Sequence, residues 1–170
     1  MKRFLVGLTI LALLPQTNFG QKKYVSDTHN FAVEFPSADV SVKTDEKNVT
    51  SYVSYSTDHR FGAIIQVGSL GTYDPKDPDP WFKKFVVDYW NPETFKNIRV
   101  LTIENAAFQN FPARRATVEF ARDNDGHMVD STMLLIVQPQ TNRYYALIGL
   151  TLREVDHSPI GRFLSSYELK

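Results

Sequence analysis

The stretch that decides the fold runs from Ala113 to Leu152 and reads ARRATVEFARDNDGHMVDSTMLLIVQPQTNRYYALIGLTL. Three largely apolar segments in it are separated by two polar turns, at 123–126 and 140–142. The first turn ends in an Asp-Gly pair, which is typical of a tight β-hairpin. Consecutive strands joined by such short turns form an antiparallel sheet. The expected strands are 113–122, 128–137 and 143–152.

The sequence before this unit predicts more strands. Phe31, Val33 and Phe35 alternate with other residues, which is the pattern of a strand with one buried face. Pro36 ends this strand, because proline cannot donate a hydrogen bond to a neighbouring strand. The remaining expected strands are 40–42, 49–56, 61–70 and 100–103, with 49–56 and 61–70 forming an antiparallel pair.

A helix is expected over 80–90, between two of these strands. Asp79 is placed to cap its N-terminus and Pro80 to occupy its first turn. Apolar residues recur along it with helical spacing, so one broad side of the helix is aromatic. A second, short helix is expected from Ser158 to Phe163. These patterns together predict an α+β fold in which helices pack on an antiparallel sheet.

The first twenty residues have the features of a secretory signal peptide. Lys2 and Arg3 are basic, the run from Phe4 to Leu14 is apolar, and Pro15 opens a short polar region. The apolar run is shorter than the roughly 20 residues that a transmembrane helix needs. We therefore expect residues 1–20 to be a signal peptide and residues 21–170 to be a single exported domain, periplasmic or secreted. No transmembrane segment is expected in the mature chain.

Composition excludes several classes of function. The 19 basic and 19 acidic side chains balance, so the chain lacks the basic surface that a nucleic-acid-binding protein normally carries. It contains no cysteine, which rules out disulfides, thiol nucleophiles, cysteine-ligated zinc and iron–sulfur clusters. A hydrophobic content of 42% is enough for an ordinary folded core. No cofactor and no nucleic-acid partner are expected.

Four short motifs give the chain, over residues 24–170, a resemblance to the PsbP/Mog1-like fold family of exported bacterial proteins. They are NFAVEFP at 30–36, NFPAR at 110–114, RYYAL at 143–147 and RFLSSYEL at 162–169. The resemblance implies an antiparallel sheet flanked by helices in an α/β/α sandwich. Relatives in this family include photosystem-assembly subunits and a Ran-binding protein. Neither activity transfers to this chain, because it carries no residue-level motif for either, and a fold alone does not define a function.

A group of acidic residues and one histidine is a candidate metal site. Asp123, Asp125 and His127 lie close in sequence, and carboxylates with an imidazole can bind a metal. An Asp-Gly turn explains the first part of this segment without any ligand. His127 and Asp130 also point to opposite faces of an extended strand. A hairpin turn and a metal site are therefore both kept as interpretations.

Other polar groups have structural explanations beside functional ones. The acidic cluster of Asp74, Asp77 and Asp79 fits turns and helix capping, with a weak calcium site as the alternative. A catalytic triad that includes His157 and one of Ser165 and Ser166 is conceivable in space, but no nucleophile-elbow motif is present. The histidines, which lack metal-binding spacing, are His29, His59, His127 and His157.

The aromatic side of the expected helix is the richest feature of the sequence. Its candidate binding residues are Trp81, Phe85, Tyr89 and Trp90. Two adjacent aromatic rows exceed what contact with one flat sheet requires, so part of this set is expected to be exposed. Tyr89 and Trp90, at the end of the helix, are the leading candidates for exposure. The alternative is that all these rings simply pack on the sheet.

Three functions remain open from the sequence. The first is an exported, non-catalytic binding or assembly module with a protein partner in the cell envelope. The second is a carrier that holds a small apolar ligand between the helix at 80–90 and the sheet. The third is a hydrolase or other enzyme whose site is assembled from distant residues. An exposed apolar patch, an apolar cavity or a pocket of perturbed titratable groups would distinguish them.

Overall fold

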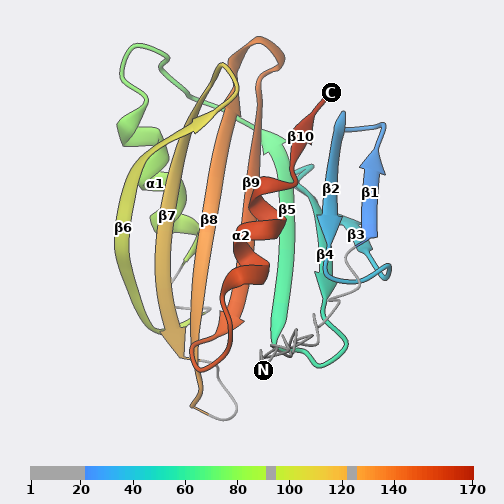
Figure 1. Ribbon diagram of the computed structural model, residues 1–170. Helices are drawn as coiled ribbons and strands as arrows, with labels where there is room; N and C mark the ends of the chain where they lie inside the picture. The colour runs from blue at the N-terminus through green and yellow to red at the C-terminus, as the bar shows by residue number, and fades with distance from the viewer. Residues whose placement is uncertain (1–21, 91–94, 122–125) are drawn as a thin grey trace, which may run out of the picture.

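The computed structural model describes residues 22–90, 95–121 and 126–170. Within these ranges the chain forms ten β-strands and two α-helices (Figure 1). The residues of the expected signal peptide lie outside the described ranges. The elements are β1 (Lys22–Ser26), β2 (Phe31–Phe35), β3 (Ser41–Thr44), β4 (Thr50–Tyr55), β5 (Phe61–Ser69), α1 (Asp79–Tyr89), β6 (Lys96–Phe108), β7 (Phe111–Ala121), β8 (Met128–Gln138), β9 (Arg143–Leu152), α2 (Ser158–Ser165) and β10 (Glu168–Leu169).

A seven-stranded antiparallel sheet forms the centre of the molecule, in the order β3-β4-β5-β9-β8-β7-β6. The stretch 113–152 supplies its β7, β8 and β9, which pair as consecutive neighbours. Met133 of β8 lies opposite Ala116 of β7 and Ile148 of β9. The expected antiparallel unit is therefore confirmed. The expected turn at 123–126 falls largely on residues outside the described ranges.

Side chains of the central strands alternate between the two faces of this sheet. In β9, Tyr145 and Leu147 belong to one buried cluster, and Tyr144, Ala146 and Ile148 belong to the other. The first cluster contains the residues of α2, and the second contains those of α1. We call these the α2 face and the α1 face. The helices thus flank the sheet on opposite sides, which confirms the expected α/β/α arrangement (Figure 1).

The α2 face is covered by a helix and a second, smaller sheet of order β1-β2-β10. Phe31 and Phe35 of β2 and Phe163 of α2 each have 0% of their surface exposed. Gly149 of β9 lets α2 approach closely, because a Cβ atom there would lie 2.8 Å from Cγ2 of Ile160. This face therefore holds a dense, largely aromatic core.

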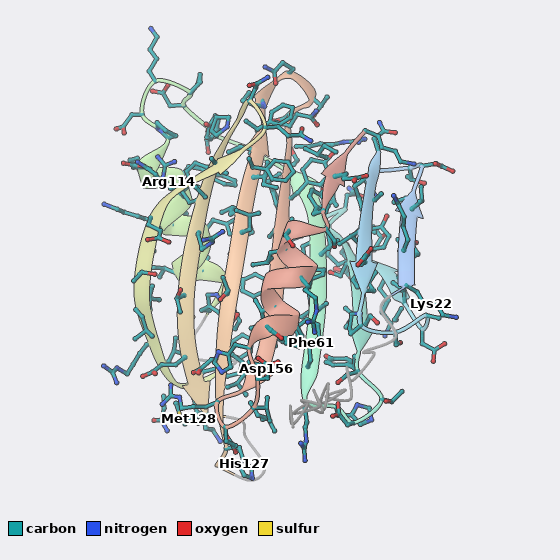
Figure 2. The ribbon with its side chains drawn as sticks, in the orientation of Figure 1. Lys22, Phe61, Arg114, His127, Met128 and Asp156 are labelled. Atoms are coloured by element: carbon teal, nitrogen blue, oxygen red, sulfur yellow. The ribbon has the colours of Figure 1, made fainter. Side chains whose placement is uncertain are left out.

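The α1 face is covered by a single helix. Phe82 and Val86 point into it and are fully buried. Arg114 of β7 fixes the start of α1, with Nη2 2.5 Å from Oδ1 of Asp79 and its guanidinium 4.9 Å from the centre of the Phe82 ring. Figure 2 shows Arg114 beside α1. The expected role of Asp79 as the N-cap is wrong, since the helix begins at Asp79 and its carboxylate binds Arg114 instead.

Two further findings complete the fold. The strand expected at 100–103 is part of β6, which runs from Lys96 to Phe108 and forms an edge of the large sheet. Among the helices of the described ranges, none combines the length and the apolar character that crossing a membrane requires.

Candidate functional site

The aromatic residues of α1 form a continuous row on one side of the helix. Trp81, Phe85 and Tyr89 lie one turn apart, and all three are half-buried. The ring centres of Trp81 and Phe85 are 5.4 Å apart and those of Phe85 and Tyr89 are 6.3 Å apart, with both pairs stacked. We call these three residues the aromatic ladder. It presents ring surface to solvent while remaining attached to the core.

Contacts with the sheet hold the ladder in one orientation. The indole Nε1 of Trp81 donates a hydrogen bond to the carbonyl of Leu70 at 2.9 Å. The ring of Phe85 meets that of Tyr144 edge-on, with centres 4.8 Å apart. Tyr144 in turn lies close over Gly68 of β5, where a Cβ atom would come within 2.7 Å of the phenol oxygen. Gly68 therefore makes the space that Tyr144, and through it the ladder, occupies.

Trp90 is separated from the ladder. It is 3% exposed, and its ring centre lies 5.0 Å from that of Phe95 and 5.1 Å from that of Phe120. The expectation that Trp90 is exposed is wrong, because the chain leaves the helix at this residue and the indole turns toward β7. Tyr89, the other leading candidate, is half-buried. Any role of the four aromatic residues in binding remains a prediction.

A cavity of about 560 Å³ adjoins the ladder, between α1 and the segment that leads into it from β5. Its apolar wall consists of Trp81, Phe85 and Tyr144. Asp74 and Asp77 also line it and supply carboxylates. Lys84 and Asp88, which also line it, form an ion pair with each other at 2.7 Å. Asp74 and Asp77 thus share one cavity with Trp81 and Phe85 of the ladder. We call this space the ladder pocket.

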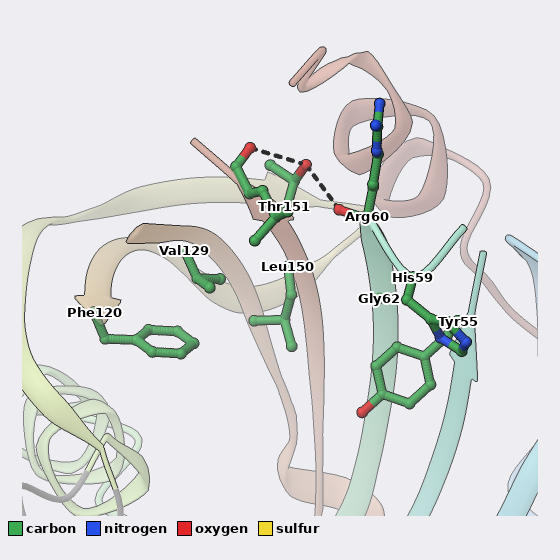
Figure 3. A pocket seen from close by; sticks show the side chains of 9 residues that line it. Tyr55, His59, Arg60, Gly62, Phe120, Val129, Leu150 and Thr151 are labelled. Atoms are coloured by element: carbon green, nitrogen blue, oxygen red, sulfur yellow. Dashed lines mark hydrogen bonds between the residues drawn. The ribbon is translucent and has the colours of Figure 1, made fainter. Parts of the chain in front are cut away.

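A second cavity, of about 420 Å³, lies on the same face of the sheet toward the C-terminal end of α1. Figure 3 shows Tyr55, Phe120, Val129 and Leu150 around it. The ring of Tyr55 covers Gly62, where a Cβ atom would come within 2.9 Å of it. The lining is mainly apolar, which suits an apolar ligand better than a charged one.

The phenols of Tyr144 and Tyr89 stay uncharged over the physiological pH range. Burial raises the pKa of Tyr144 to about 12, and the nearby Asp45 carboxylate adds to the shift. Burial also raises the pKa of Tyr89, with smaller contributions from Tyr55 and Tyr144. Both groups therefore act as neutral rings with a hydroxyl and not as phenolates. The α1 face thus offers aromatic surface and carboxylates, which are suited to binding.

The metal site expected near the 123–126 turn is only partly within the described ranges. Asp123 and Asp125 lie outside them. His127, at the end of the molecule shown in Figure 2, has Nδ1 2.7 Å from Oε1 of Glu154. In the ranges that the structure describes, no group of three or more histidines and acids is arranged to hold a metal ion. A site formed by Asp123, Asp125 and His127 stays a prediction.

The residues considered for a catalytic triad make other contacts. The hydroxyl of Ser165 donates to the carbonyl of Arg162, and that of Ser166 donates to the carbonyl of Phe163. Nε2 of His157 lies 3.6 Å from the carboxylate of Asp130. Both serine hydroxyls therefore hydrogen-bond to backbone carbonyls at the C-terminal end of α2. Asp74, from the acidic cluster, accepts a hydrogen bond from the backbone of Lys76 and stabilises a turn.

Sequence reasoning missed an ionic network on the α2 face. Glu119 is 7% exposed, and its carboxylate pairs with Arg99 at 2.8 Å and with Arg153. Arg153 also binds Asp130 at 2.8 Å. The one available signal was that Glu119 stands between two apolar residues in the decisive stretch, Val118 and Phe120. Its arginine partners come from distant strands and loops, so spacing alone does not reveal them.

Solved structures share this architecture. The cyanobacterial PsbP, CyanoP, from Synechocystis matches 88% of this chain and 92% of its own, with a TM-score of 0.63 and 8% sequence identity. The Ran-binding protein Mog1p from Saccharomyces cerevisiae matches 88% of this chain and 95% of its own, with a TM-score of 0.56 and 11% identity. The chain has the PsbP/Mog1-like fold. No protein-family model and no curated protein matches the sequence. The structural similarity establishes the PsbP/Mog1-like fold, and at sequence identities this low no function transfers with it.

Proposed function

We propose that the chain is an exported, non-catalytic binding or assembly module that engages a protein partner in the cell envelope through the aromatic ladder of α1. The observation that carries this proposal is the row of three stacked, half-buried rings, Trp81, Phe85 and Tyr89, beside the ladder pocket. Aromatic side chains of this kind supply most of the binding energy in many protein interfaces.

Rigidity of the ladder supports a role in binding. The hydrogen bond from Trp81 to Leu70 and the contact of Phe85 with Tyr144 restrain the rings before any partner arrives. The ladder therefore loses less conformational entropy when a partner binds. A pre-organised ring surface therefore binds more tightly than the same rings on a mobile loop.

Charge around the ladder indicates the chemistry of the partner segment. Asp74 and Asp77 are exposed and line the ladder pocket together with Trp81. A lysine or arginine side chain placed there gains both carboxylate and cation–π interactions. We therefore expect the partner to present an apolar residue next to a basic one.

The fold and the N-terminal sequence are consistent with this proposal. A yeast protein with the same fold is described as Ran-binding, so the fold is compatible with binding to another protein. The expected signal peptide at 1–20 supports export, which would place the partner in the envelope or outside the cell.

A carrier of a small apolar ligand is the second candidate. The second cavity on the α1 face, about 420 Å³ and lined by Phe120, Val129 and Leu150, favours it. This volume falls in the range of roughly 300–1,000 Å³ that small-molecule sites occupy. Such a ligand would lie against the sheet and not on the outer side of α1.

A comparative pull-down from the source cell envelope tests the proposal. The tagged protein is compared with a Trp81→Ala/Phe85→Ala variant and with Val87→Ala, a control at a position of α1 that is 59% exposed. We expect one stoichiometric partner that is retained by the control and lost by the double variant, with circular dichroism showing that both remain folded. Equal recovery by all three proteins contradicts the ladder as the interface. Recovery of nothing above background favours the carrier.

A further inference from the structure

The α2 helix covers only part of its face of the sheet. It lies along β9, where Ile160 rests over Gly149, and leaves β6, β7 and part of β8 without a helix on that side (Figure 1). A cavity of about 490 Å³ lies between α2 and the strands β7 and β8. We call it the α2 pocket. It is on the opposite side of the sheet from the aromatic ladder.

Small residues on α2 keep this pocket open. Gly161 and Ser165, one turn apart, line it from the helix. A Cβ atom added at Gly161 would meet no other atom within 4 Å. Ile160 and Leu164 are buried in the core and also line the pocket. The pocket therefore borders the packed side of α2, and the small residues Gly161 and Ser165 leave its remaining space unfilled.

The floor of the α2 pocket changes from apolar to polar along the strands. Phe108, Leu134 and Tyr167 line one part. Thr117 and Thr132, which lie directly opposite each other on β7 and β8, line another. Arg115 lies between these parts, opposite Leu134. The pocket therefore offers an apolar surface, two hydroxyls and a guanidinium in one continuous space.

Arg115 is a permanent positive charge that lines this pocket, and His157, which also lines it, has Nε2 3.6 Å from the carboxylate of Asp130. Across the described ranges, no carboxylate forms an ion pair with it, although Glu104 stands opposite it on β6. The acids nearer the base of α2 are already engaged, since Glu119 pairs with Arg99 and Asp130 with Arg153. The guanidinium of Arg115 is exposed and carries five donors.

Tyr167 closes the pocket at the end of α2. It lines the α2 pocket and is 4% exposed. Its hydroxyl is shielded from solvent and has no hydrogen-bond partner among the described residues, so the pocket does not offer this group to a ligand. Burial raises the pKa of Tyr167, with smaller contributions from Tyr145 and Tyr52, so the phenol remains neutral.

We infer that the α2 pocket binds a small amphipathic carboxylate. The carboxylate accepts hydrogen bonds from Arg115 and from the hydroxyls of Thr117 and Thr132. The apolar body of the ligand lies along Leu134 toward Phe108. This site is separate from the proposed partner-binding function, since it uses the other face of the sheet.

Titration of the purified protein with three probes tests this assignment. Octanoate has both an anionic head and an apolar body, acetate has only the head, and octylamine has the opposite charge. We expect saturable binding of octanoate, below its micellar concentration, with amide NMR shifts concentrated in β7, β8 and α2. Acetate should bind at least about tenfold more weakly, since it buries little apolar surface. Octylamine should not bind there.

Two variants test separately what the charge of Arg115 and the open space of the α2 pocket contribute to binding. Arg115→Gln should weaken octanoate binding at least about tenfold, because a charge-assisted hydrogen bond is lost. Lys47→Gln, at an exposed lysine of the β3–β4 turn that lines neither cavity, is the control for loss of a positive charge and should bind as the parent does. Gly161→Leu should abolish binding by filling the pocket, and the open space around Gly161 lets the helix accept it without unfolding.

Several outcomes would overturn the assignment. They are no saturable binding of octanoate, equal binding of octylamine, unchanged affinity in Arg115→Gln, or NMR shifts that fall on α1. Thermal unfolding of each variant shows whether a loss of binding reflects a loss of fold.

Discussion

The two faces of the seven-stranded sheet are covered in different ways. The α2 face is covered over β9 by a helix and a three-stranded sheet, and Phe31 and Phe163 of this covering layer are fully buried. The α1 face carries one helix, whose Trp81 and Phe85 remain half-buried. Both faces use the same strands, so the difference comes from the covering layer. It implies that aromatic residues of the α2 side chiefly stabilise the fold, whereas those on the outer side of α1 are available for binding.

The largest effect should separate two phenylalanines, one on each helix. Phe163→Ala should cost about 3–5 kcal/mol of unfolding free energy, because it leaves a cavity in a closed core. Phe85→Ala should cost about 1–2 kcal/mol, since its ring is half-buried. Urea denaturation followed by circular dichroism measures both, and Val87→Ala serves as the exposed control. Equal costs for the two phenylalanines would remove the distinction between the faces.

A smaller effect should distinguish two close-approach glycines. Gly149→Ala places a methyl group 2.8 Å from Cγ2 of Ile160, near the branch point of a packed side chain, and should cost about 1–3 kcal/mol. Gly68→Ala meets the far end of the Tyr144 side chain, which borders the ladder pocket, and not a branch point. We expect about 1 kcal/mol or less for that change. Denaturation midpoints of the two variants check the order.

The cause of the Gly149 effect can be isolated with a double variant. Ile160→Ala removes the atoms that the new methyl group would meet. Gly149→Ala combined with Ile160→Ala should therefore cost less than the sum of the two single changes, by about 1 kcal/mol or more. Additive costs would show that Gly149 is needed for another reason than the approach of α2.

Much of the fold was predictable from the sequence, because the central strands have buried and regular neighbours. The three segments in 113–152 correspond to β7, β8 and β9 within one or two residues. Their short turns leave antiparallel pairing as the simplest arrangement. The helix expected over 80–90 corresponds to α1. In these regions the hydrophobic pattern and the tertiary structure carry the same information.

The elements that were not predicted are exposed, short or dependent on distant partners. β6 lies at an edge, is mostly exposed and has two irregularities in its pairing, so its side chains lack a strict alternation. β1 and β10 become strands only by pairing with β2. The burial of Trp90 depends on Phe120, thirty residues further along the chain. None of these partners is visible from local spacing.

Alkaline pH should probe the α1 face through Tyr144. Its folded pKa of about 12 is above the ordinary value of 10, so the unfolded chain loses this proton first as pH rises. Stability should therefore fall from about pH 10 toward pH 12. In Tyr144→Phe this fall should be shallower, with the remainder due to tyrosines such as Tyr89 and Tyr167. Urea midpoints at pH 9 and pH 11 measure it, and an unchanged slope would show that Tyr144 is not shielded from water.

The smallest effect should appear at mildly acidic pH, where His29 meets the α2 face. Its Nδ1 lies 2.6 Å from the hydroxyl of the buried Tyr52. Desolvation, together with the positive charge of Arg143, lowers the pKa of His29. The unfolded chain then takes up a proton first, so stability should decline as pH falls below about 6.5. The decline should be slight, since His29 is half-buried, and His29→Gln should reduce it. Urea midpoints at pH 7.5 and 5.5, compared between the parent and His29→Gln, measure this decline in stability. If His29→Gln leaves the slope of the parent unchanged, this pH dependence belongs to other groups, and His29 adds nothing to the stability that the apolar core around Tyr52 provides.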